Sequence, residues 1–361
     1  MSKSSKKQER SGSTAPTTAR ETTKVGPIEK KAKAPKAPRE ELSVLEWCKK
    51  YLTKEKLHRF FFGTKEKQGF LKQFTTYALL IAIGFIYLYP VLYMFSTSFM
   101  NQNDLLDSSV KWIPSTLYVQ NYIDAGRSME FWTSFVKGIV IAGVPTVLSV
   151  VSTMIAGYGF ATFSFRGKKI LMALLIFSYI LPSQVTMIPT YVLYSNLKMT
   201  GSLMAFVLPA LFGNGLNAPI FILIFYQFFR QVPKVLIEAA QIDGAGYFKS
   251  FVRIAIPSAG PAILTVFLFC FVWYWNESYL TELYVKGIAS TKSFWENLVI
   301  QLKDFNTNYS DRLSTGDAAT SLSESVRMAA TALTILPLLI MYFFLQRHFV
   351  ESIDRTGITG E

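Results

Sequence analysis

The polar residues most suited to binding a solute stand at the end of an apolar run, in the segment Trp273-Tyr274-Trp275-Asn276-Glu277. An aromatic face can pack against the C–H face of a sugar, and the neighbouring amide and carboxylate can bind its hydroxyl groups. Polar and acidic residues inside an apolar span are functional-site hypotheses by default. The three aromatic residues are equally typical of the belt that membrane proteins place at the lipid–water interface. Both interpretations stay open from these residues alone.

A second group of polar residues interrupts the apolar stretch 203–229 near its middle. Asn214 and Asn217 lie there among glycines and prolines. A broken backbone at membrane depth is tolerated only where protein or a water-filled cavity covers it, because lipid cannot hydrogen-bond the freed groups. The break therefore indicates a solute pathway, and the candidate lining residues are Asn214, Asn217, Trp273, Trp275, Asn276 and Glu277.

A third polar stretch, residues 232–257, lies between two apolar runs and reads VPKVLIEAAQIDGAGYFKSFVRIAIP. Its first apolar residues recur at helical spacing, which predicts a short amphipathic helix. Gly244 can supply the positive φ of a tight turn at low cost. The residues after it predict a second short helix, and Pro257 restricts the backbone before the next apolar run. The sequence therefore predicts a helix-turn-helix that projects from a membrane.

The spacing within this stretch resembles the EAA loop of bacterial ABC-importer permeases. The family pattern is E-A-A, three residues, G, nine residues, I, one residue, an aliphatic and P, and here Ile256 stands where the family usually has Leu. The segments EAAQIDGA, FVWYWNESYL and FLQRHFVESIDRTGITG resemble the carbohydrate-uptake branch and are similar to the second permease of the maltose importer. The resemblance extends from about residue 74 to the C-terminus, whereas the long N-terminal tail and the insertion 286–324 depart from shorter members.

This resemblance implies a non-catalytic permease subunit that works by alternating access, driven by ATP hydrolysis in separate subunits. The implied partners are a sister permease in a heterodimer, two ATPase subunits, an extracytoplasmic solute-binding protein, membrane lipid and a carbohydrate substrate. Residues 232–257 would be the coupling loop that docks on the ATPase. Its implied contact residues are Glu238 as the anionic contact, Ala239 and Ala240 as the close-packing face, Gly244 as the turn, and also Asp243, Ala245, Phe251, Ile254 and Pro257.

Motifs for catalysis or cofactor binding are absent from the sequence. Gly167-Lys168-Lys169 lacks the earlier glycine and the following Ser or Thr of a phosphate-binding loop. There is no H-E-x-x-H, no G-x-S-x-G and no His/Cys spacing typical of a metal site. We therefore expect no enzyme activity, no metal and no cofactor in this chain, with ATP and Mg bound by partner subunits.

Composition and periodicity predict an all-α polytopic membrane protein. Half of the 361 residues are hydrophobic and 17% are charged. A membrane-spanning helix needs about 20 apolar residues, and six stretches qualify. Lysine and arginine favour the short loops 164–169 and 230–258, which places them inside together with both termini. We expect a multi-pass protein of the bacterial plasma membrane, with spans at 74–99, 135–163, 170–194, 203–229, 262–280 and 328–349.

The basic character of the chain belongs to its N-terminal part. Residues 1–72 hold 19 of the 37 lysines and arginines but only 8 of the 24 acidic residues. Residues 1–39 have too few large apolar side chains to offset chain entropy, which predicts a disordered tail. Residues 40–72 mix basic and apolar residues in a way that predicts an amphipathic helix on an anionic membrane surface. No nucleic-acid-binding module is recognised, so we expect no nucleic-acid partner. The six-span domain would occupy residues 73–361.

Three other functions remain open at this point. A secondary active transporter would also use broken spans, but it would need its own ion or proton site and has no use for the coupling pattern. An ABC importer for a solute other than a sugar is the second alternative. A membrane scaffold that recruits partners through its amphipathic helix is disfavoured by the interrupted fourth span.

Overall fold

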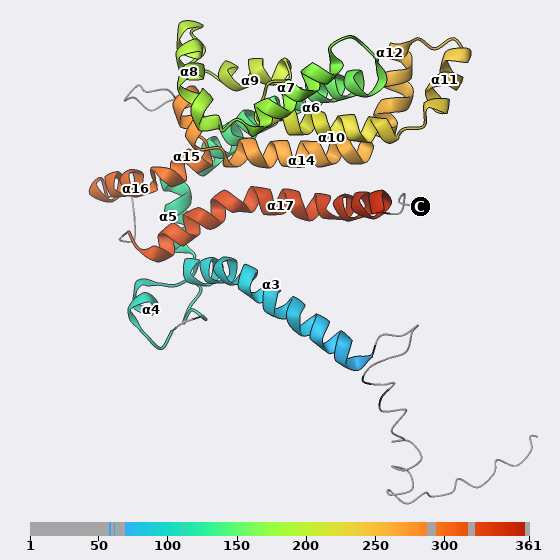
Figure 1. Cartoon of the computed structure of the whole chain (residues 1–361). Coiled ribbons are helices and arrows are strands. Elements are labelled where there is room, and N and C mark those ends of the chain that lie inside the picture. Colours follow the sequence, from blue (N-terminus) through green and yellow to red (C-terminus); the bar gives the residue numbers. More distant parts are fainter. Residues whose placement is uncertain are drawn as a thin grey trace, which may run out of the picture. The chain divides into compact units, whose positions relative to one another are not determined.

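The computed structural model describes His58, Phe61 and residues 69–110, 112–286, 294–316 and 322–357, with the side chains of Lys234 and of residues beyond 347 left out. Every regular element in these ranges is helical (Figure 1), which confirms the all-α fold. The predicted tail at 1–39 lies outside the described residues, as does most of the predicted surface helix at 40–72. The chain divides into two units, Met1–Leu79 and Leu80–Glu361, and the packing described below lies within the second.

Three single helices among the described residues are long and apolar enough to cross a membrane. They are α3 at Phe70–Ser98, α6 at Phe131–Thr162, and the segment Glu324–Arg347 of α17, which continues to Gly357. These helices match the predicted first, second and sixth spans. Each has an internal proline, at Pro90, Pro145 or Pro337.

The other candidate spans are pairs of helices with a sharp bend between them. The first pair is α7 with α8 (Lys168–Ile180 and Ser183–Asn196), bent by 98°. The second is α10 (Ala218–Gln231) with the stretch Val235–Ile242 of α11, bent by 72°. The third is Tyr247–Ser258 with α14 (Gly260–Asn276), bent by 75°. Counting each bent pair as one span gives up to six within the described part of the chain. The predicted third span at 170–194 is bent between α7 and α8, because Pro182 holds Leu181 in an extended conformation (ψ 123°) and has no N–H to continue the helix.

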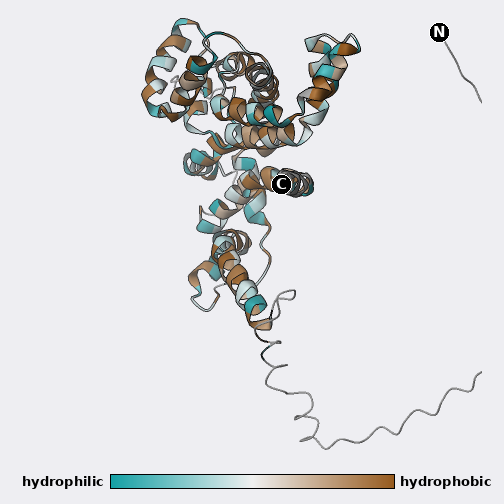
Figure 2. Ribbon diagram, turned by 45° about the vertical axis from the view of Figure 1, so that its right-hand side comes forward, coloured by the Kyte–Doolittle hydropathy of each residue, from teal (hydrophilic) through white to brown (hydrophobic). Residues whose placement is uncertain are grey.

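The core of the second unit is built around α6, which packs against α9 (Met204–Leu211), α10 and α14. Helix α17 lies along α5 (Gln120–Ser128) and α14 (Figure 1). Phe221, Phe225 and Val266 are fully buried between these helices. Many large apolar side chains elsewhere are exposed, and Figure 2 shows hydrophobic residues on nearly every helix. This distribution is expected for helices that face lipid on one side and protein on the other.

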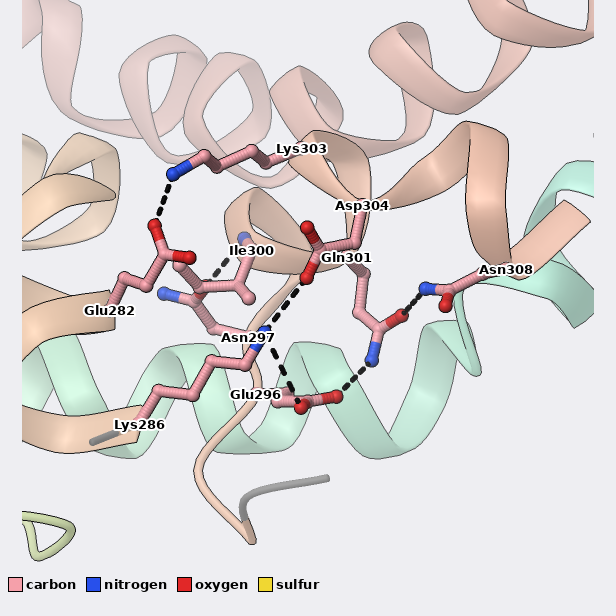
Figure 3. Close-up of polar contacts among 9 residues, drawn as sticks. All are labelled: Glu282, Lys286, Glu296, Asn297, Ile300, Gln301, Lys303, Asp304 and Asn308. Atoms are coloured by element: carbon pink, nitrogen blue, oxygen red, sulfur yellow. Dashed lines mark hydrogen bonds and ion pairs between the residues drawn. The ribbon is translucent and has the colours of Figure 1, made fainter. Parts of the chain in front are cut away.

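A polar network joins the π-helix η2 (Thr281–Lys286) to α15 (Leu298–Lys303) and α16 (Phe305–Ser314) (Figure 3). Lys286 Nζ lies 2.8 Å from Asp304 Oδ2 and 3.8 Å from Glu296 Oε1, and the Glu296 side chain is only 10% exposed. Gln301 Nε2 donates to Glu296 at 2.9 Å. Lys286 therefore links η2 to Asp304, which is 40% exposed, and to the nearly buried Glu296.

We expect Lys286→Met to destabilise this region by about 1.5–3 kcal/mol, because Asp304 and the nearly buried Glu296 would both lose the ammonium group that lies 2.8 Å and 3.8 Å from them. The matched control is Lys303→Met, whose partner Glu282 is 36% exposed, and it should cost about 0–1 kcal/mol. Thermal unfolding of the purified protein measures both changes. Equal losses in the two variants would contradict the assignment.

The pH dependence of this contribution follows from the pKa of Lys286. Burial lowers that pKa, but the hydrogen bond and charge of Asp304, with the charges of Glu296 and Glu282, outweigh burial, so the pKa lies above its ordinary value. A lysine whose pKa is raised in the folded protein contributes its full stabilisation at any pH below the ordinary pKa of lysine. This contribution is lost only as the pH rises through the raised pKa. The effect of Lys286→Met should therefore be the same in mildly acidic and mildly basic buffer.

Candidate functional site

The predicted helix-turn-helix is present at residues 232–257. Its first helix is α11 (Lys234–Ile242), and its second part runs through α12 (Tyr247–Ser250), the π-helix η1 (Phe251–Ala255) and α13 (Ile256–Ser258). The turn after α11 has Gly244 at φ 79°. The Gly244 N–H donates to the Gln241 carbonyl and the Ala245 N–H donates to the Ala240 carbonyl at 2.8 Å. This is the hydrogen-bond pattern of a Schellman motif, in which a left-handed residue closes the helix.

The projecting end of this loop exposes large apolar side chains. Val235 is 70% exposed, Ile242 87% and Phe248 79%, and Leu236, Tyr247 and Val252 are exposed as well. Glu238, Ala239 and Asp243 lie on the same exposed segment. Contiguous exposed apolar side chains beside charged ones are typical of surfaces that contact another protein or a membrane.

The base of the loop is anchored in the helical bundle. The ring of Phe251 is 8% exposed and lies 4.6 Å from the ring of Tyr158 on α6, with Phe229 of α10 beside both. The predicted contact residues therefore divide into three groups. Glu238, Ala239, Asp243, Gly244 and Pro257 are exposed, Ala240, Ala245 and Ile254 are half-buried, and Phe251 is buried as the anchor.

The predicted interruption of the fourth apolar stretch is also present. Helix α9 ends at Leu211 and α10 begins at Ala218, and we call residues 212–217 the α9–α10 break. Gly213 (φ 71°) and Asn217 (φ 54°) have left-handed backbone conformations there. Asn214 and Asn217 both have exposed side chains.

The aromatic residues at the end of α14 mostly fill the core of this chain. Trp275 is 2% exposed, stacks on Phe271 at 5.9 Å between ring centroids, and lies against Gly138 of α6. Trp273 is half-buried, with its ring 5.3 Å from that of Phe221. The buried position of Trp275 places it neither in an exposed interfacial belt nor on an open sugar-binding surface of this chain.

The two polar residues that follow these aromatic residues remain accessible to different degrees. Asn276 is exposed at the last position of α14. Glu277 is half-buried, and its Oε1 accepts a hydrogen bond from the Leu280 N–H at 2.9 Å. Within this chain, exposed amides at Asn214, Asn217 and Asn276 are therefore the accessible polar groups of the candidate pathway.

Tyr274 and Ser152 were not among the predicted site residues, yet both bind the backbone around the α9–α10 break. The Leu216 N–H donates to Tyr274 Oη at 3.0 Å, and Ser152 Oγ donates to the Ala210 carbonyl at 2.6 Å. A signal existed in the sequence, because Thr146, Ser149 and Ser152 recur every third residue and so share a face of α6. Among the described residues, no group of three or more His, Cys, Asp or Glu side chains could hold a metal ion.

Residues 138–355 match the family described as "Binding-protein-dependent transport system inner membrane component". The chain belongs to this family. It is therefore the permease subunit of an ABC importer, a non-catalytic multi-pass protein of the cytoplasmic membrane. The family works with an ATPase, which binds the ATP, and with a solute-binding protein.

Several relatives cover most of this permease. It is 30% identical over 299 residues to the osmoprotective compounds uptake permease protein GgtD of Synechocystis sp., covering 81% of this chain and 94% of that protein. It is 28% identical to the arabinooligosaccharides transport system permease protein AraQ of Halalkalibacterium halodurans, covering 77% and 93%. It is 25% identical to the diacetylchitobiose uptake system permease protein DasC of Streptomyces coelicolor, covering 78% and 95%.

A solved structure has the same fold. The crystal structure of a bacterial ABC transporter involved in the import of the acidic polysaccharide alginate contains a chain that superimposes with a TM-score of 0.66. The match covers 77% of this permease and 96% of that chain, at 23% sequence identity. At this identity the likeness concerns the fold alone.

Proposed function

We propose that this permease takes up a carbohydrate, either a sugar or an oligosaccharide. The observation that carries the proposal is the α9–α10 break, where Asn214 and Asn217 expose amides within an apolar stretch. Amide groups donate and accept hydrogen bonds, as recognition of sugar hydroxyls requires. The names of AraQ and DasC support the same substrate class.

In this proposal the coupling loop transmits the work of ATP hydrolysis to the spans. Two permeases, this chain and a sister subunit, form a heterodimer, and each inserts its loop into a cleft on one of two ATPase subunits. Glu238 is the anionic contact, and the exposed apolar residues around it are buried by docking. Because Phe251 anchors the loop against Tyr158 and Phe229, a movement of the loop pulls directly on α6 and α10.

The orientation that this mechanism needs has both termini and the coupling loop in the cytoplasm. We expect an impermeant thiol reagent to label single cysteines within residues 101–120 from outside. Single cysteines within residues 244–250 should be labelled only after permeabilisation. The opposite labelling pattern would reverse the topology and remove the coupling loop from the side where ATP is hydrolysed.

The substrate class is tested on the assembled transporter. Co-purification followed by mass spectrometry of bound subunits identifies the sister permease, the ATPase and the binding protein. We then expect ATPase activity of the reconstituted complex to rise only when the binding protein and a carbohydrate from a panel of oligosaccharides are both present. Stimulation by an osmoprotective compound instead would favour a substrate like that named for GgtD. Solute uptake by the chain without any ATPase would identify a secondary transporter.

A further inference from the structure

We propose that Tyr274 and Ser152 are positioning residues of the solute pathway. Their hydroxyl groups, from two different helices, hold the α9–α10 break in the shape that presents Asn214 and Asn217. The inference rests on the proposed function, because the role of these two asparagines in the pathway is itself proposed.

The first support is the pairing of backbone groups that the break releases. Tyr274 of α14 accepts the Leu216 N–H at 3.0 Å, between the two asparagines. Ser152 of α6 donates to the Ala210 carbonyl at 2.6 Å, in the last turn of α9, as a second hydrogen bond beside that of the Gly213 N–H at 3.2 Å. An unpaired backbone group costs more in lipid than in water because no solvent can replace the lost partner. The two hydroxyl groups therefore stabilise both sides of the break.

The second support is the close approach of the backbone to these hydroxyl groups at Gly215. A Cβ atom added there would lie 2.5 Å from Ser149 Oγ, 2.7 Å from Tyr274 Oη and 3.3 Å from Ala210 Cα. The φ of Gly215 is not positive, so the absence of a side chain is needed for space rather than for backbone conformation. The backbone of the break therefore packs directly against hydroxyl groups of α6 and α14.

The third support is that Tyr274 itself has little freedom to move. It is 1% exposed, and its ring lies 5.4 Å from the ring of Phe206 on α9. A hydroxyl held this firmly fixes Leu216, and with it the directions in which the neighbouring asparagines project. Loss of the hydroxyl should leave the ring packed and release the break alone.

The experiment uses the full transporter in sealed vesicles, with Cys48 and Cys270 replaced by alanine and a single cysteine at position 214 or 217. The measured quantity is the rate at which a small, charged, membrane-impermeant methanethiosulfonate modifies that cysteine. We expect Tyr274→Phe and Ser152→Ala each to change this rate about tenfold at one or both positions. Each substitution removes one hydrogen bond to the backbone, and a tenfold change corresponds to about 1.4 kcal/mol. Ser152→Thr, which keeps the hydroxyl, should restore the original rate.

The matched control is Ser128→Ala. Ser128 is buried on α5, and its hydroxyl has no hydrogen-bond partner among the described residues, so its removal should leave both rates unchanged. If neither Tyr274→Phe nor Ser152→Ala changes a rate, with both variants at normal membrane abundance, the positioning role is overturned. If Tyr274→Phe does not assemble, Ser152→Ala and Ser152→Thr decide the matter.

The outcome also separates this inference from the proposed function. Cysteines at 214 and 217 that do not react in the parent protein would overturn the pathway role and the inference together. Cysteines that react at rates independent of Tyr274 and Ser152 would overturn the inference alone. Because the probe is a thiol reagent, the result does not depend on which solute is carried.

Discussion

Gly244→Val is expected to abolish both solute uptake and co-purification of the ATPase, while the permease reaches the membrane in normal amount. Gly244 has a φ of 79°, a region in which a β-branched residue is a genuine outlier. A valine would have to leave this conformation, which would break the hydrogen bonds that close α11. The surface made by Glu238 and its apolar neighbours would then no longer fit the ATPase. The spans are untouched, so insertion and pairing with the sister permease should be normal.

The chain provides a control for this substitution two residues away. Gly244 and Gly246 both have open space around an added Cβ, but Gly246 has an ordinary φ of −67°. Gly244→Ala should therefore cost about 1–2 kcal/mol of loop stability through the left-handed conformation, whereas Gly246→Ala should not. Amide hydrogen exchange in α11 and uptake in the same preparations measure the difference. Equal behaviour of the two alanine variants would show that the positive φ is unimportant.

Glu238→Lys tests the charge of the same surface. In the proposed docked state Glu238 faces a basic group in a partly desolvated cleft, and an unpaired charge there costs on the order of 3–5 kcal/mol. That cost would weaken docking by a few hundredfold or more, at about 1.4 kcal/mol per tenfold. A solvated helix with no partner would instead tolerate the change within about 0.5 kcal/mol. Full uptake by the combined Glu238→Lys and Gly244→Val variant would leave the coupling role without support.

Gly157→Ala is expected to disrupt the packing of α6 against α10. A Cβ atom at position 157 would lie 2.5 Å from Phe225 Cβ, 2.9 Å from the Tyr226 backbone N and 3.0 Å from the Ile222 carbonyl O. None of these atoms can rotate away, so the helices must separate, at a cost of about 1–3 kcal/mol for one extra methyl group. Larger side chains should prevent assembly.

The control for this prediction is Gly159→Ala in the same helix. Gly159 has open space around an added Cβ, and replacing glycine by alanine in a helix gains up to about 1 kcal/mol at either site. The difference between the variants therefore isolates the contact with α10. Thermal stability of the purified transporter should fall for Gly157→Ala and hold or rise for Gly159→Ala. A fall of the same size in both would contradict the close-packing assignment.

Features that depend on local spacing could be predicted from the amino-acid sequence alone. Long apolar runs predicted the helices α3, α6 and α17, because the length needed to cross a membrane is a property of one segment. The pattern around Glu238 and Gly244 predicted the helix-turn-helix at residues 232–257, since a helix, its closing turn and the left-handed glycine involve residues close together in the chain. The cluster of Gly, Asn and Pro at residues 209–219 predicted the break for the same reason.

The side of each span that faces protein could not be predicted from the sequence and is seen only in the packed helices. Trp275 at the end of α14 is buried, and the Tyr274 hydroxyl meets Leu216, 58 residues earlier in the chain. Gly157 and Gly159 look equivalent in the sequence. A Cβ atom added at Gly157 would nevertheless meet α10, whereas one added at Gly159 would meet nothing within 4 Å. The physical reason is that spans facing both lipid and protein are apolar around their whole circumference, so hydrophobic periodicity does not mark the buried face. The pairing of hydroxyl groups and glycines across helices therefore becomes visible only when the helices are packed.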